Sequence, residues 1–161
     1  MTKMLSLACC LLTGLVASAQ WRGGDLSFLP SLEAVDYAYK DAGGTPIEDV
    51  PQWMVDQGMN LARYRLWNDP ARLYHALPGV VQEAKRMQEA GMDILIDFHF
   101  SDSWADPGQQ IAPRMWQYLS FDEAQDAMAC WLVCVMETFA QEGVDIAMVQ
   151  LGNETDPGMM H

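Results

Sequence analysis

Side chains that could bind and cleave a sugar follow four short apolar stretches of this sequence. Aromatic faces pack on sugar rings, and carboxylate, amide, guanidinium and imidazole groups hydrogen-bond to hydroxyls. Cleavage of a glycosidic bond needs a carboxylic acid and a second carboxylate. The candidates, in chain order, are Asp25, Arg63, Arg65, Trp67, Asn68, Asp69, Asp97, His99, Ser101, Asp102, Trp104, Asp106, Asn153 and Glu154.

Glu154 is the best placed of these residues for acid catalysis. It follows the apolar run Met148–Leu151 and sits beside Asn153, at the predicted end of a buried strand. A carboxyl group there could protonate a leaving oxygen, and a retaining mechanism would need a nucleophile about 5 Å away. Other interpretations remain open for the other residues. Arg63 could pair with a carboxylate at the rim, Asp97 could be a structural partner, and the tryptophans could cover the core.

Asp97 and His99 also allow a metal-assisted hydrolase. They are two residues apart, so both point the same way from a strand. They would be half of a metal site, but no second histidine follows a strand, since His75 lies in a linker and His161 is terminal. We therefore predict no metal ion and no cofactor, and keep metal-assisted hydrolysis as a weaker alternative.

Three segments share a pattern that predicts the elements around these residues. They are "DQGMNLARYRLW", "EAGMDILIDFHF" and "QEGVDIAMVQLGNE". In each, a glycine suited to a left-handed helix end precedes a short apolar strand. An earlier strand is predicted within "WRGGDLSFL", and alternation with helices indicates an α/β fold, either a doubly wound sheet or a barrel. Both folds bind ligands at the carboxyl ends of their strands.

The helices between the strands have recognisable signals. Capping-box spacing occurs at Thr45 and Glu48, and again at Ser120 and Glu123. A second helix is predicted over residues 80–90, entered through Pro78. The last helix has an apolar stripe, and its two cysteines are predicted to be buried and unpaired. The stripe comprises Met128, Trp131, Leu132, Val135 and Phe139, and the cysteines are Cys130 and Cys134.

Composition limits the possible partners. The 161 residues suffice for one domain, and the net charge of -13 argues against nucleic acid and anionic membranes. A neutral polysaccharide is compatible with this charge. Residues 1–19 read as a secretory signal peptide, with Lys3, an apolar run over residues 5–16 and Ala17-Ser18-Ala19 at the cleavage site. We therefore expect residues 20–161 to be secreted, into the extracellular space or the periplasm.

Several stretches together resemble glycoside hydrolase family 53, the arabinogalactan endo-β-1,4-galactanases. They are "GGDLS", "YAYKDAGG", "NLARYRLWNDP", "DILIDFHFSDSWADPGQQ" and "VQLGNET". The resemblance runs from about Trp21 to Gly158 and implies a (β/α)8 TIM barrel with retaining chemistry. Residues 20–161 would be the amino-terminal half of that barrel, covering roughly its first four β/α units. The implied substrate is β-1,4-galactan or arabinogalactan.

The resemblance also implies roles for individual residues. Glu154 corresponds to the general acid/base, Asn153 binds the sugar 2-hydroxyl, and Arg63 supports the nucleophile. The third-strand motif would shape the sugar cleft through Asp97, His99, Asp102, Trp104 and Asp106. One departure is that Gly158, Met159, Met160 and His161 stand where family members have glycine, two apolar residues and tryptophan.

The family's nucleophile is a glutamate on the seventh strand, and no segment of this sequence corresponds to it. A complete barrel takes about 250 residues. We therefore expect the chain to be a fragment of a galactanase, inactive alone, with any calcium site in the later loops. The alternative is a non-catalytic secreted galactan-binding protein that keeps the cleft.

Overall fold

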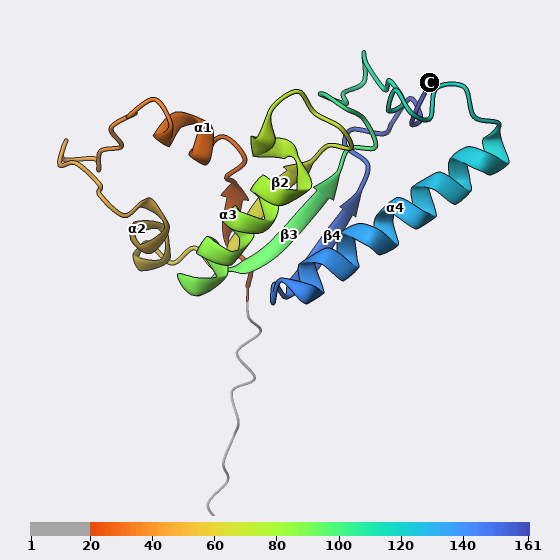
Figure 1. Cartoon of the computed structure of the whole chain (residues 1–161). Coiled ribbons are helices and arrows are strands. Elements are labelled where there is room, and N and C mark those ends of the chain that lie inside the picture. The colour runs from red at the N-terminus through yellow and green to blue at the C-terminus, as the bar shows by residue number, and fades with distance from the viewer. Residues whose placement is uncertain (1–19) are drawn as a thin grey trace, which may run out of the picture.

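A four-stranded parallel sheet forms the centre of the molecule in a computed structural model, which describes residues 20–161 (Figure 1). The predicted signal peptide lies outside the described residues. Strands β1 (Gly23–Asp25), β2 (Leu61–Leu66), β3 (Asp93–Phe98) and β4 (Ile146–Leu151) lie in the order β1-β2-β3-β4. This confirms the predicted α/β fold. The strand order does not reverse, as it would in a doubly wound sheet, so the sheet fits the barrel interpretation.

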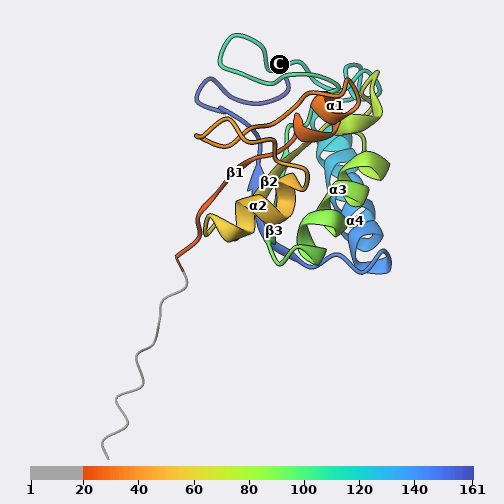
Figure 2. The same ribbon diagram turned by 90° about the vertical axis from the view of Figure 1, so that its left-hand side faces the viewer.

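The two long helices lie together on one side of the strands (Figure 2). They are α3 (Leu77–Glu89) and α4 (Phe121–Gln141), joined at their surface by an ion pair between Lys85 and Glu142. The shorter helices are α1 (Leu29–Glu33), α2 (Val50–Asp56) and the 3₁₀ turn η1 (Leu73–His75). None of the helices within residues 20–161 has the length and hydropathy needed to cross a membrane.

The predicted helix ends are largely confirmed. Gly58, Gly91 and Gly143 have φ angles of 85°, 98° and 75°, in the left-handed region that glycine adopts without a steric penalty. At the start of α4, the Ser120 hydroxyl accepts a hydrogen bond from the Glu123 amide, while the Glu123 carboxylate accepts one from the Ser120 amide. The predicted capping box is therefore present.

The capping box predicted at Thr45 and Glu48 is wrong. Helix α2 begins later, and Asp49 caps it by accepting a hydrogen bond from the Gln52 amide at 3.0 Å. The Thr45 amide instead donates to the Asp41 carboxylate at 2.8 Å. This turn holds Thr45 in a loop, because an aspartate that binds nearby backbone amides competes with helix formation.

Helix α3 begins earlier than predicted, at Leu77 rather than Val80. Pro78 lies in its first turn, where a helix has no internal hydrogen-bond acceptor for a backbone N–H. The prediction that the two cysteines are buried is wrong, because Cys130 and Cys134 are exposed on α4. The predicted apolar stripe does face the core, with Val135 and Phe139 fully buried.

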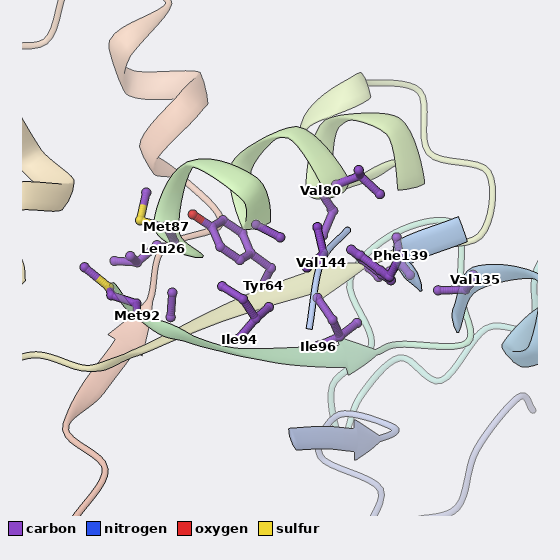
Figure 3. Packing of buried hydrophobic residues seen from close by; sticks show 14 of the residues in the cluster. Leu26, Tyr64, Val80, Met87, Met92, Ile94, Ile96, Val135, Phe139 and Val144 are labelled. Atoms are coloured by element: carbon purple, nitrogen blue, oxygen red, sulfur yellow. The ribbon is translucent and has the colours of Figure 1, made fainter. Parts of the chain in front are cut away.

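Alternation along the strands separates the core from the polar face of the sheet. Tyr64 on β2 and Ile94 and Ile96 on β3 are buried against the helices, close to Val80 and Phe139 (Figure 3). Residues between them on the same strands point to the opposite face, because successive strand side chains alternate. Arg63, Arg65 and Asp97 are on that opposite face.

Candidate active site

Arg63 connects side chains from all four strands at the carboxyl end of the sheet. Strand register places Asp25 beside Arg63, and Asp97 beside Gln150. The guanidinium forms an ion pair with Asp25, and its Nη2 lies 2.5 Å from Asp97 Oδ2 and 3.0 Å from Asn153 Oδ1. Its Nε donates to Gln150 Oε1 at 3.2 Å. One arginine therefore holds three of the candidate residues and one additional residue, Gln150, in a fixed arrangement.

Asp97 and His99 form a buried pair beside this arginine. Asp97 is fully buried, and its Oδ2 lies 2.8 Å from His99 Nε2. The other ring nitrogen, Nδ1, accepts from Trp67 Nε1 at 3.1 Å and from the Ala105 amide at 3.3 Å. Two donors at Nδ1 require the ring proton to be on Nε2, facing Asp97.

This arrangement bears on the metal-assisted alternative. With donors at Nδ1 and a proton on Nε2, neither nitrogen of His99 has a free lone pair for a metal ion. Within residues 20–161, no three His, Cys, Asp or Glu side chains converge in a way that could hold a metal. The geometry therefore favours an organising role for His99 over a ligating one.

Arg65, one of the candidates in the sequence, is a buried cation. Its guanidinium lies 4.5 Å from the centre of the Phe28 ring and 4.2 Å from that of Trp104. Such contacts stabilise a cation on aromatic faces. Burial lowers the pKa of Arg65, an effect that the nearby Asp25 carboxylate opposes. Trp104 is thus held from one side and remains 42% exposed.

His75 was predicted to lie in a linker but is buried in η1. Its ring centre lies 4.2 Å from that of Trp67. Burial lowers the pKa of His75 to about 4, and the nearby positive charge of Arg65 acts in the same direction. His75 therefore supports Trp67 as a neutral ring, a role that no local sequence signal indicated.

Asn153 and Glu154 follow β4 in a loop with unusual backbone geometry. Asn153 Nδ2 donates to the Ala105 carbonyl at 2.7 Å, while its Oδ1 accepts from Arg63. Gly152 and Glu154 have φ angles of 84° and 49°. The left-handed backbone at Glu154 is disfavoured for a non-glycine residue and is typical of functional sites. The Glu154 side chain is exposed, so it can meet a ligand.

The remaining predicted residues shape the loop between β3 and α4. Asp102 accepts hydrogen bonds from the Asp69 and Arg114 amides, both at 2.9 Å, one on each carboxylate oxygen. Asp106 accepts from the Gly108 amide at 2.8 Å, which closes a turn. Sugar binding by Asp102, Trp104 and Asp106 stays a prediction, but these bonds already give both carboxylates a loop-organising role.

Comparison with known proteins identifies the family. The sequence profile of glycosyl hydrolase family 53 matches residues 21–161. The chain belongs to glycosyl hydrolase family 53. This confirms the family that the sequence motifs resemble, and the match includes every described residue except Gln20.

Relatives of this family 53 chain include fungal and bacterial proteins. Arabinogalactan endo-β-1,4-galactanase A of Aspergillus niger is 36% identical over 146 residues, which are 89% of this chain and 41% of that protein. The enzyme of the same name from Emericella nidulans is 33% identical over 161 residues, covering 100% of this chain and 45% of the relative. An uncharacterised protein of Niallia circulans is 38% identical over 138 residues, or 86% of this chain and 37% of that protein.

Solved family structures confirm the barrel. A fungal β-1,4-galactanase superposes with a TM-score of 0.82 and 29% identity, covering 88% of this chain and 42% of that chain. The family 53 catalytic domain of Ignisphaera aggregans gives a TM-score of 0.79 and 33% identity, with coverage of 86% and 41%. The chain thus comprises the first β/α units of a (β/α)8 barrel and spans less than half the length of these relatives.

Proposed function

We propose that this chain carries the general acid/base of a secreted family 53 glycosidase that hydrolyses internal β-1,4-galactosidic bonds of galactan or arabinogalactan. The observation that carries the proposal is the cluster in which Arg63 joins Asp25, Asp97 and Asn153 next to the exposed Glu154. It lies where barrel enzymes place their chemistry, at the carboxyl ends of the strands. The galactanases among the relatives supply the substrate class.

In the proposed double displacement, Glu154 first donates its proton to the leaving oxygen while a second carboxylate attacks the sugar carbon. Glu154 then takes a proton from the water that releases the sugar with retained configuration. The nucleophile in this proposal is a glutamate outside residues 20–161. Arg63 presents a fixed positive charge beside the reaction, and the chemistry needs no cofactor.

Asn153 can bind a sugar hydroxyl in this proposal without breaking its existing contacts. Its side chain uses one amide hydrogen on the Ala105 carbonyl and accepts hydrogen bonds from Arg63 and Gln150. An amide has two hydrogens and two acceptor lone pairs, so one hydrogen remains to donate to a sugar oxygen. Trp67 and Trp104 provide aromatic surface near the same end of the sheet, and their centres lie 5.7 Å apart.

The test is hydrolysis of β-1,4-galactan by the protein expressed from its full reading frame. We expect Glu154→Gln to lower turnover about 10²–10⁴-fold, the usual contribution of a general acid/base. Azide should partly restore cleavage of an aryl galactoside, because azide needs no general base. Glu137→Gln on α4 is the matched control, since Glu137 is exposed and outside the cluster. Wild-type activity that survives Glu154→Gln would contradict the proposal.

A binding assay separates the enzyme from a galactan-binding protein. We expect residues 20–161 alone to show no turnover, because the proposed nucleophile is not among them. Calorimetry with galacto-oligosaccharides would measure whether the cluster binds sugar by itself. Binding by the full protein without any turnover would replace the enzymatic proposal with the non-catalytic one.

A further inference from the structure

Gln110 lies in the loop between β3 and α4 and is only 4% exposed. Its side-chain Nε2 lies 2.9 Å from the Asn153 carbonyl oxygen, 3.2 Å from that of Glu154 and 3.3 Å from that of Asp106. All three acceptors are backbone oxygens. Gln110 therefore ties the loop after β3 to the two residues after β4 that the proposed chemistry uses.

The backbone that Gln110 contacts is strained. Glu154 is a non-glycine residue with a φ of 49°, two residues after Gly152 with a φ of 84°. Such a conformation persists only when neighbouring groups hold it. Gln110 donates to the carbonyl of the strained residue itself and to that of the residue before it. The direction of the Glu154 side chain depends on this backbone conformation.

Among the described residues, Gln110 is the side chain that donates to the carbonyls of residues 153 and 154, whereas Gln150 donates to the Gly152 carbonyl at 3.0 Å. Asn153 is held through its side chain by Arg63 and Ala105. The exposed Glu154 side chain has no hydrogen bond to any other residue in the described part of the chain, so its orientation depends on its backbone. A buried polar side chain that donates to strained backbone is costly to replace, since removal of the donor leaves carbonyl oxygens unpaired.

We propose that Gln110 is a positioning residue, whose buried amide fixes the left-handed backbone at Glu154 and thereby aims the Glu154 carboxyl at the leaving oxygen. This proposal rests on the proposed role of Glu154 as general acid/base. A catalytic group displaced by about 1 Å can lose about 10²-fold in rate. The loss should appear in kcat, because Gln110 is buried and does not itself face the substrate.

The test compares Gln110→Leu, Gln110→Glu and the control Gln117→Leu in the full-length protein. Leucine keeps the approximate volume but has no donor. Gln117 is exposed in the same loop and donates to the Ala112 carbonyl, away from residues 153 and 154. We expect Gln110→Leu to lower kcat about 10²-fold with KM changed less than threefold. Gln117→Leu should match the wild type.

Gln110→Glu supplies a readout that loss of folding would not produce. A carboxylate at this position faces three carbonyl oxygens and can donate only when it is protonated. The activity of this variant relative to the wild type should therefore rise as pH falls from 7 to 5, while the relative activity of Gln110→Leu stays flat. A flat ratio for both variants, or an increase in KM with unchanged kcat, would overturn the proposal.

Hydrogen exchange distinguishes failure of this inference from failure of the proposed function. If the wild type does not hydrolyse galactan, the proposed function fails. Amide exchange in residues 152–158 then still tests whether Gln110 holds the backbone of this loop. We expect at least tenfold faster exchange there in Gln110→Leu and no change in Gln117→Leu. Unchanged exchange in Gln110→Leu would show that Gln110 does not hold this backbone.

Discussion

The outer faces of β3 and β4 have the same alternating pattern but different surroundings. On β3, Ile94, Ile96 and Phe98 are fully buried beneath the helices. On β4, Val149 and Leu151 are 45% and 59% exposed, because no helix among the described residues covers them. Alternation therefore sets the direction of a strand side chain, whereas burial requires a covering element.

Helix α4 shows the same contrast within one element. Val135 and Phe139 are fully buried against the sheet, while Val133 on another side of the helix is 57% exposed. Cys130 and Cys134 share that exposed side. We define the open side of the molecule as these three α4 residues together with Val149 and Leu151. The predictions that follow compare exposed residues, including this open side, with residues buried in the core or in the cluster around Arg63.

The largest difference should appear in the apolar core. Phe98→Ala removes a fully buried ring that packs edge-on against Trp131, with 5.4 Å between ring centres. We expect it to lower the free energy of unfolding by about 3–5 kcal/mol. Leu151→Ala on the open side should change it by about 0.5 kcal/mol or less. Urea denaturation followed by tryptophan fluorescence measures both. Equal losses would mean that the open side is covered in solution.

Ion pairs should show the next largest difference. Asp97→Asn leaves the partly buried Arg63 without one of its carboxylate partners, and we expect a loss of about 3 kcal/mol. Asp69→Asn breaks the exposed pair with Arg114 and should cost at most about 1 kcal/mol. The same denaturation assay compares them. A loss below 1 kcal/mol for Asp97→Asn would contradict a tightly coupled cluster around Arg63.

The buried histidine should make stability depend on pH. Burial lowers the pKa of His75 to about 4 from its unfolded value of 6.5, so the unfolded state binds the proton more readily. The contribution is therefore complete above pH 6.5 and is lost as pH falls towards 4, by about 3 kcal/mol. We expect His75→Phe to reduce the change of melting temperature with pH over this range. The exposed control His161→Phe should leave that change as it is in the wild type.

The smallest effect concerns the thiols on the open side. Cys130 and Cys134 should react with iodoacetamide in the folded protein without denaturant, because both are exposed. Cys130→Ser should change stability by about 0.5 kcal/mol or less. Mass spectrometry counts the modified thiols. Complete protection of both cysteines in the native protein would show that another segment or molecule covers α4.

Local pattern predicted the strands and the gathering of polar residues well. Arg63 and Asp97 lie on β2 and β3 rather than after them, while Asn153 follows β4, and parallel register brings their side chains together. The prediction missed Arg65 and His75 as organising residues. Their roles come from contacts with Phe28, Trp67 and Trp104 across loops, which spacing along the chain does not reveal.

The errors at Thr45 and the cysteines have related physical causes. The spacing of Thr45 and Glu48 fits a capping box, but the Thr45 amide donates to the Asp41 carboxylate instead. The cysteines have the polarity of core residues, but their position around α4 turns them away from the sheet. A competing acceptor four residues away decided the first outcome and the packing of α4 on the sheet decided the second, whereas the Ser120 capping box met no competing partner and formed as predicted.

The four charged residues of the cluster around Arg63 cancel one another. Asp25 and Asp97 are matched by Arg63 and Arg65, so the acidity of a chain with net charge -13 lies elsewhere on its surface. Added salt screens exposed charges over distances of about 10 Å but hardly alters such a compensated cluster. Ionic strength should therefore change how readily acidic polysaccharides approach this protein, while the binding of a neutral sugar at the cluster stays nearly constant.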